Sequence, residues 1–392
     1  MIAYNKTDLE NTLLVEEALN LYDGGFINKE QYRMIESELP PLKKQPRLLL
    51  RAGLLLVGLI LCASIGGVVS LFAFSLHDAG IIAFVIAAIT LVGLEWMVRS
   101  KKYFGYGLDD AFLWSFQLAT GAGVLIVLEA LDYSEQWTIW FWGIGVLVVT
   151  SLCALRYLNV VSLVAACVFA TFTAVYWLVE EKVSLASFAM MAFAALLGLG
   201  FYTLRKRTKA DVYSALWTWG WYYSLLLFYL SGNMVIVLNF SLYFYMAEAS
   251  DMVVSLHYID YFYWFMTFAV PLSYIALGVK QRDKGSLWLG LFTLAFSLYN
   301  LVQLTAFLSG AWWLTLGGLL LFGLTFILVK RLKNKQTGLT FEADRLADDT
   351  DFIHVEALIV AAQLGLKPGA SQEAPMKMGG GDFSGGGAGG SF

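Results

Sequence analysis

The sequence predicts an all-α fold, a polytopic transmembrane helical bundle of about ten spans with short cytoplasmic helical ends. Three observations lead to this prediction. Of the 392 residues, 59% are hydrophobic and only 14% are charged, whereas soluble domains carry about 25% charged residues. Successive apolar stretches are long enough to cross a bilayer, which takes about 20 residues. The basic residues gather in every second connection between those stretches.

Residues 1–47 are expected to form a cytoplasmic helical hairpin. Thr7-Asp8-Leu9-Glu10 has the capping-box pattern that opens a helix, and Gly24-Gly25 suits its end because glycine adopts the left-handed conformation. Asn28-Lys29-Glu30-Gln31 opens a second helix in the same way, and Pro40-Pro41 stops it. A hairpin of this size buries little core alone, so we expect it to dock on the membrane domain or on another protein.

Residues 48–335 are expected to form the transmembrane bundle. The spans are predicted at 52–76, 79–98, 111–131, 137–155, 157–179, 183–204, 213–238, 259–278, 286–308 and 311–330. The region 213–258 is the least regular, with an interruption at Leu230-Ser231-Gly232-Asn233. Two crossings flanking an outer segment at 239–258 are its simplest solution, and that segment is either interfacial or a lid over a substrate.

The distribution of lysine and arginine predicts the orientation, because short cytoplasmic loops are enriched in both. One alternate set of connections holds nineteen basic residues: Lys43, Lys44, Arg47, Arg51, Arg99, Lys101, Lys102, Arg156, Arg205, Lys206, Arg207, Lys209, Lys280, Arg282, Lys284, Lys330, Arg331, Lys333 and Lys335. The other set holds only Lys182. We therefore expect both termini in the cytoplasm.

The C-terminal end divides into two predicted segments. Residues 336–375 are an acidic cytoplasmic stretch with one amphipathic helix, marked by apolar residues at helical spacing from Phe352 to Ala362. Residues 376–392 form a glycine-rich tail that is expected to be disordered. Its aromatic residues, Phe383 and Phe392, are candidates for binding a protein partner, and a plainly solvated tail is the alternative.

Ionisable residues inside a span indicate function by default, because burying charge in lipid is costly. Two glutamates meet this description. Glu95 lies four residues before Arg99, a spacing that predicts an ion pair on one helix face. Glu129 lies near the outer end of its span. Both are interpreted as structural or interfacial.

A candidate intramembrane polar site consists of Gln117, Asn300, Gln303 and Pro271, which all lie within predicted spans. The amides commonly join helices by hydrogen bonds, and a substrate site is the alternative. Pro271 could break its helix and free carbonyl groups for a ligand, as in transporters with discontinuous helices.

No catalytic or metal-binding motif is evident. Cys62, Cys153 and Cys167 are scattered in apolar stretches, the three histidines are far apart, and no nucleophile or zinc motif occurs. We therefore expect no enzyme activity and no cofactor. The net charge of −4 argues against nucleic acid as a partner.

The run Leu21-Tyr22-Asp23-Gly24-Gly25-Phe26-Ile27-Asn28-Lys29-Glu30-Gln31-Tyr32, followed by Leu39-Pro40, contains glycine, isoleucine and Glu-Gln-Tyr in a recognisable order. It resembles the N-terminal hairpin of a family of bacterial predicted multi-span membrane proteins of unknown function. The Gly-rich C-terminal tail is similar to tails of several unrelated bacterial membrane proteins. The resemblance implies a bacterial inner membrane and brings no known activity or catalytic residues.

Two functions follow as hypotheses. The first is a non-enzymatic scaffold or assembly partner in the cell envelope, with the lipid bilayer as its environment and protein partners at the hairpin and tail. The alternative is a secondary transporter or facilitator of a neutral or apolar small solute, since ten spans would suit two inverted repeats.

Overall fold

In the residues that the computed structural model describes, the chain is all-α, as predicted, with twelve α-helices and one π-helical turn. The described residues are 2–45, 47–72, 76–181, 186–208, 212–245, 257–281 and 283–304, with isolated positions between 315 and 330. The helices are α1 (Lys6–Asp23), α2 (Lys29–Glu38), α3 (Leu48–Ser70), α4 (Leu76–Trp96), η1 (Met97–Lys101), α5 (Leu108–Ala130), α6 (Glu135–Tyr157), α7 (Val160–Glu180), α8 (Ala186–Arg207), α9 (Ser214–Gly232), α10 (Met234–Tyr245), α11 (His257–Gln281) and α12 (Lys284–Leu304).

Seven helical segments are long and apolar enough to cross a membrane, so the chain is an integral membrane protein. They are α3, α4 continued through η1, α5, α6, α7, α8 and α11. The helices α9 and α12 are not among the seven. The α9 sequence is rich in tryptophan, tyrosine and serine, which lower its hydropathy although aromatic rings suit a membrane interface. Most of the expected span 311–330 lies outside the described residues.

The expected hairpin is present as α1 and α2. The second helix opens with the predicted capping box: the Gln31 amide donates to the Asn28 side chain at 2.8 Å, and Asn28 N–H donates back to Gln31 at 2.9 Å. The predicted start of the first helix at Thr7 is wrong. Asn5 supplies the cap, accepting from the Thr7 amide at 3.1 Å, so the cap lies two residues before the predicted one and α1 begins at Lys6.

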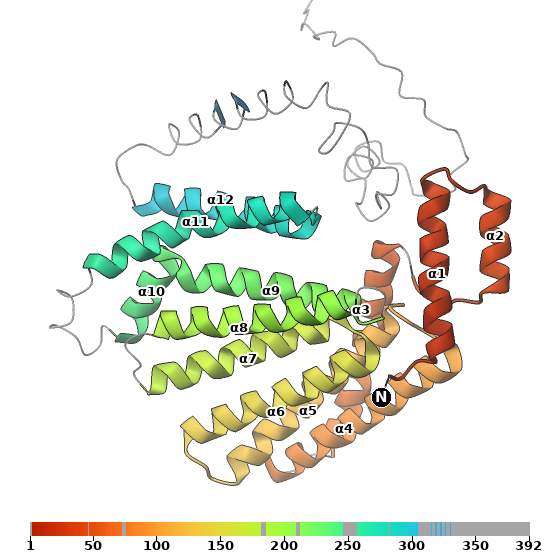
Figure 1. Cartoon of the computed structure of the whole chain (residues 1–392). Coiled ribbons are helices and arrows are strands. Elements are labelled where there is room, and N and C mark those ends of the chain that lie inside the picture. The colour runs from red at the N-terminus through yellow and green to blue at the C-terminus, as the bar shows by residue number, and fades with distance from the viewer. Residues whose placement is uncertain are drawn as a thin grey trace, which may run out of the picture. The chain divides into compact units, whose positions relative to one another are not determined.

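The membrane helices pack as consecutive pairs: α4 with α5, α6 with α7, α8 with α9, and α11 with α12. Helix α9 is central, because it also contacts α7, α10, α11 and α12 (Figure 1). Small residues allow close approach. At Gly143 an added Cβ would lie only 2.6 Å from the Thr173 hydroxyl, and at Gly93 it would lie 2.6 Å from the Phe112 ring.

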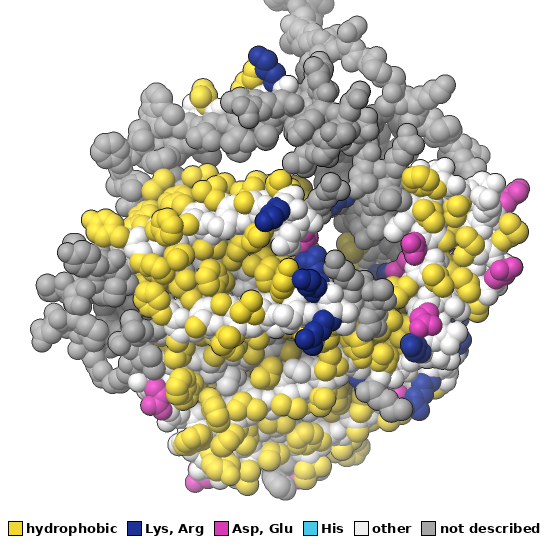
Figure 2. All heavy atoms as spheres, in the orientation of Figure 1, with side chains coloured by type: hydrophobic (Ala, Val, Ile, Leu, Met, Phe, Trp, Pro, Cys, Tyr) yellow, Lys and Arg dark blue, Asp and Glu magenta, His cyan; other side chains and the backbone are white. Residues whose placement is uncertain are grey.

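Basic side chains gather at one end of the helices, here called the basic end. Figure 2 shows lysine and arginine side chains at the helix ends nearest the hairpin, while apolar side chains cover the middle of the same face. The basic end includes Arg99 and Lys102 beside α4, Arg156 of α6, and Arg205 of α8. Many large apolar side chains along the spans are exposed, as expected of surfaces that face hydrocarbon rather than water.

The predicted single span 213–238 is wrong in its extent. Helix α9 ends at Gly232, and α10 begins at Met234 after a break at Asn233, whose backbone is extended (φ −82°, ψ 126°). The interruption visible in the sequence at Leu230–Asn233 is therefore a true helix break. Figure 1 shows α10 turning away from the direction of α9.

Candidate functional site

The break between α9 and α10 is built around the side chain of Asn233, which is completely buried. Its Oδ1 accepts hydrogen bonds from the Val235 and Ile236 amides at 3.1 and 3.3 Å. The Met234 amide donates to Thr267 Oγ1 of α11 at 3.0 Å. The first amides of a helix have no partner within it. Here polar side chains supply those partners, so the backbone can break while buried.

Asn233 also connects three helices, α9, α10 and α12, through its side chain. Its Nδ2 donates to the Tyr229 hydroxyl of α9 at 2.9 Å, and its Oδ1 accepts from Asn300 Nδ2 of α12 at 3.1 Å. The Tyr229 hydroxyl lies 2.7 Å from Ser297 Oγ of α12. All four side chains are at most 2% exposed. The predicted polar residue Asn300 is thus held by another amide.

Pro271 of α11 has its missing hydrogen bond replaced from the neighbouring helix. A proline in a helix leaves the carbonyl four residues earlier without its backbone donor, and here that carbonyl belongs to Thr267. Ser297 Oγ donates to the Thr267 carbonyl at 2.6 Å. The proline therefore provides a bond between α11 and α12, and α11 continues through it as one helix.

Gln117 lies at the inner end of a hydrogen-bonded chain that starts at the basic end. Arg51 Nη2 of α3 donates to Asp110 Oδ2 of α5 at 2.6 Å, and Asn159 Nδ2 donates to Asp110 Oδ1 at 2.8 Å. Ser162 Oγ donates to Asn159 Oδ1 at 3.2 Å, and Gln117 Nε2 donates to Ser162 Oγ at 2.7 Å. The chain joins α3, α5 and α7. Gln117 and Asn300 are therefore placed in separate networks.

Glu95 is the centre of a clamp between α4 and α6. Its Oε2 lies 3.0 Å from Arg99 Nε, the pairing expected from their spacing. Its Oε1 accepts from Arg156 Nη2 and from the Tyr157 hydroxyl, each at 2.6 Å. The contacts with α6 are the shorter ones, so Glu95 binds the neighbouring helix in addition to its own.

Asp283 forms a second clamp, between α8, α9 and α12. It accepts from Arg205 Nη1 at 2.9 Å, from the Tyr222 hydroxyl at 2.6 Å and from Ser286 Oγ at 2.9 Å. Burial alone would raise the pKa of Asp283, but these hydrogen bonds from Tyr222, Arg205 and Ser286 outweigh it and hold the pKa below its usual value. Asp283 is therefore a carboxylate at neutral pH.

The hairpin is fastened to the basic end by backbone hydrogen bonds. The Lys43 amide donates to the Lys102 carbonyl at 2.9 Å, and the Phe104 amide donates to the Lys43 carbonyl at 3.1 Å. The Ala3 amide donates to the Arg156 carbonyl at 2.9 Å. An ion pair of 2.9 Å joins Asp8 of α1 to Lys102.

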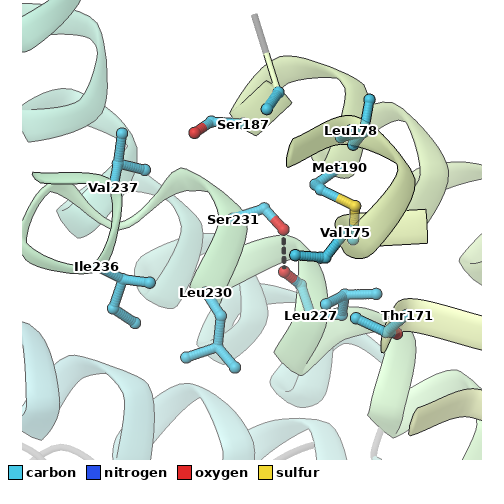
Figure 3. A pocket seen from close by; sticks show the side chains of 11 residues that line it. Thr171, Val175, Leu178, Ser187, Met190, Leu227, Leu230, Ser231, Ile236 and Val237 are labelled. Carbon is cyan, nitrogen blue, oxygen red and sulfur yellow. Dashed lines mark hydrogen bonds between the residues drawn. The ribbon is translucent and has the colours of Figure 1, made fainter. Parts of the chain in front are cut away.

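A cavity of about 150 Å³ lies beside the helix break (Figure 3). Helices α7, α8, α9 and α10 line it with Thr171, Val175, Leu178, Ala186, Ser187, Met190, Leu227, Leu230, Ser231, Ile236 and Val237. Figure 3 shows the side chains of Val175, Met190 and Leu178 on one side and those of Ile236 and Val237 on the other. Neither Gln117 nor Asn300 reaches it.

Some predicted residues cannot be placed. The backbone of Gln303 lies in α12, but its side chain is outside the described residues. Phe383, Phe392 and the segments 336–375 and 376–392 also lie outside them. Among the described side chains, no three His, Cys, Asp or Glu residues form a group that could hold a metal ion.

Sequence reasoning did not select several polar residues that the structure brings into contacts. Asp109 accepts from the Gly105, Tyr106 and Gly107 amides at 2.7, 2.9 and 2.9 Å. One signal could have found both it and Asp283. Each aspartate lies four residues before a Leu-Trp pair where α5 or α12 begins at the basic end.

The chain matches no protein-family model, and neither a curated protein nor a solved structure matches it. Arguments about function therefore rest on the chain's own residues.

We expect Asn233→Ala to lower the free energy of unfolding by about 2 kcal/mol, because it leaves buried donors of α10 and Asn300 without an acceptor. Thermal unfolding of the purified protein in detergent measures the loss. Asn239→Ala is the matched control, since Asn239 is exposed on the same helix α10. Equal effects of the two substitutions would contradict the assignment of Asn233 as the cap.

Glu95→Ala is expected to destabilise the protein by about 2 kcal/mol, since it removes the partner of Arg156 and Tyr157. The same unfolding measurement applies. Glu129→Ala removes a carboxylate from an exposed position on the neighbouring helix α5, and it should leave the unfolding temperature nearly unchanged. A Glu95 variant as stable as the Glu129 variant would show that the clamp contributes little.

Proposed function

We propose that the chain is a non-enzymatic scaffold or assembly partner of the bacterial cell envelope. In this proposal it crosses the inner membrane about ten times, with α9, α12 and residues 311–330 as crossings in addition to the seven apolar helices. The basic end and both termini lie in the cytoplasm, in keeping with the enrichment of lysine and arginine in cytoplasmic loops. The hairpin then lies on the cytoplasmic side of the membrane, attached to the ends of the membrane helices.

The observation that carries the proposal is the contrast between α1 and α2. Helix α1 buries Leu9, Thr12, Val15 and Ala18, whereas no residue of α2 is buried. A helix that served only to complete a core would be covered on one face. Helix α2 is held in position while most of its surface stays accessible, which suits a site for binding another protein.

Exposed apolar side chains on the hairpin support a protein partner. Phe26, in the turn before α2, is 58% exposed, and Met34 of α2 is 60% exposed. Large exposed apolar and aromatic side chains are favoured at the centres of protein interfaces. Tyr32 is stacked on Tyr22 of α1 at 5.8 Å, so α2 is braced against α1 while it presents this surface.

Transport of a polar solute is the weaker proposal. A polar solute needs hydrogen-bonding groups that can exchange partners along its path. The buried amides of Gln117, Asn233 and Asn300 already bond to other protein groups. A facilitator of an apolar solute would not need such groups and stays as the second candidate.

Cysteine labelling tests the proposed orientation. We expect Met34→Cys on α2 to react with a membrane-impermeant maleimide only after cells are permeabilised, and Trp137→Cys at the start of α6 to react in intact spheroplasts. Both positions are exposed, and the three native cysteines are buried. The reverse pattern would overturn the orientation, and labelling of the unmodified protein sets the background.

Site-specific crosslinking tests the scaffold. A photo-reactive amino acid at Met34 should yield discrete protein adducts in cells, and Phe26→Asp should reduce them several-fold by placing a charge in the interface. The same photo-reactive group at Leu196, which is 69% exposed on the apolar span α8, is the control and should give no such adduct. If Met34 and Leu196 gave the same products, the hairpin would not be a specific docking site.

A further inference from the structure

The cavity beside the helix break lies in the half of the bundle away from the basic end. It is lined by Leu178, near the end of α7, by Ala186, the first residue of α8, and by Ser231, near the end of α9. Helix α10 completes the lining because the chain turns at Asn233. Had α9 continued straight, Ile236 and Val237 would not lie where they do.

Two of the three side-chain hydroxyls in the lining, those of Ser231 and Thr171, are already bonded within the protein. Ser231 Oγ donates to the Leu227 carbonyl of its own helix at 2.8 Å. Thr171 Oγ1 donates to the Cys167 carbonyl at 2.9 Å and lies 2.8 Å from the Tyr223 hydroxyl. Ser187 supplies the third hydroxyl of the lining. A buried water needs two to four polar partners, and this lining has too few unused hydrogen-bonding groups to hold a water molecule.

None of the described side chains that line the cavity is ionisable. A charged or strongly polar ligand would lose its hydration without replacement, which costs several kcal/mol. An apolar group has no hydrogen bonds to lose on entering, and it gains contact with Val175, Met190 and Leu227. The lining therefore favours a hydrocarbon ligand over a charged or strongly polar one.

The volume sets the size of the group. An apolar cavity of about 150 Å³ lined by leucine, isoleucine and phenylalanine stays dry and takes up benzene or xenon. The cavity here has a volume of about 150 Å³, so it suits a group with about as many carbon atoms as benzene.

The surroundings identify the source of that group. Residues on the same helices, outside the cavity, are large, apolar and exposed: Phe172 and Trp177 of α7, and Leu196 and Leu199 of α8. Two of these helices qualify as membrane spans, so their exposed surfaces meet lipid hydrocarbon. We propose that the cavity is a binding site for the end of one lipid acyl chain, held between α7, α8, α9 and α10.

Photolabelling in lipid nanodiscs tests the proposal with the full chain. The probe is a phosphatidylcholine that carries a diazirine near the end of one acyl chain, and insertion sites are read by tandem mass spectrometry. We expect insertion at Val175, Met190 and Leu227 to exceed insertion at the lipid-facing Leu196 several-fold. Benzene added before illumination should compete at the cavity positions and leave Leu196 labelling unchanged.

Two variants that fill the cavity keep the test decisive. Ser231→Leu replaces a hydroxyl that bonds only to its own helix, and Val175→Phe enlarges the opposite wall. Either folded variant should reduce cavity labelling at least about five-fold, whereas Leu196→Phe, on the exposed face of α8, should not. Cavity labelling no stronger than that of Leu196, or unchanged in a folded cavity-filled variant, would overturn the proposal.

Discussion

The absence of hydrogen-bonding partners in hydrocarbon governs the structure, because each polar group buried there needs a partner within the protein. Two features break the regular helical pattern in the second half of the bundle, the gap at Asn233 and the proline at Pro271. Each would leave backbone groups unbonded by itself. The structure places them together at Thr267. The Thr267 hydroxyl accepts a hydrogen bond from the first amide of α10, and the Thr267 carbonyl accepts one from the Ser297 hydroxyl.

The basic end follows the same constraint with charged groups. Glu95, in α4, and Asp283, just before α12, each accept hydrogen bonds from an arginine and a tyrosine, although they lie in different halves of the chain. Removing one partner from a part-buried ion pair leaves an uncompensated charge. These clusters therefore tie the ends of α4 to α6 and of α8 to α9 and α12. The hairpin is fastened beside the first cluster, through the bond from the Ala3 amide to the Arg156 carbonyl.

The sequence was sufficient to predict the features that depend on local spacing. Hydropathy located α3 to α9, α11 and α12 to within several residues. The capping box at Asn28 and Gln31 required only a three-residue spacing. The break at Asn233 was visible as an interruption. The structural role of Asn233 could not be predicted, because nothing in the neighbouring sequence indicates whether such a residue lies in a loop or caps a buried helix.

The contacts between distant residues could not be predicted. Asn233 and Asn300 are 67 residues apart, and Glu95 and Arg156 are 61 apart. A single sequence contains no information on which helices become neighbours, so it identified the pairing of Glu95 with Arg99 four residues away and missed the shorter contact with Arg156. The cavity was missed for the same reason, since its lining comes from four helices.

The hydrogen bond between the Ala3 amide and the Arg156 carbonyl has a consequence for biosynthesis. Ala3 is synthesised long before its acceptor, which lies at the end of α6, the fourth of the apolar helices. The hairpin can form its own capping box early, and its bonds to Lys102 and Phe104 need only the segment that follows α4, whereas the bond of Ala3 must wait until α6 has been made. During that interval the Ala3 amide has no acceptor on α6, and formation of this bond marks the point at which the first four spans are in place.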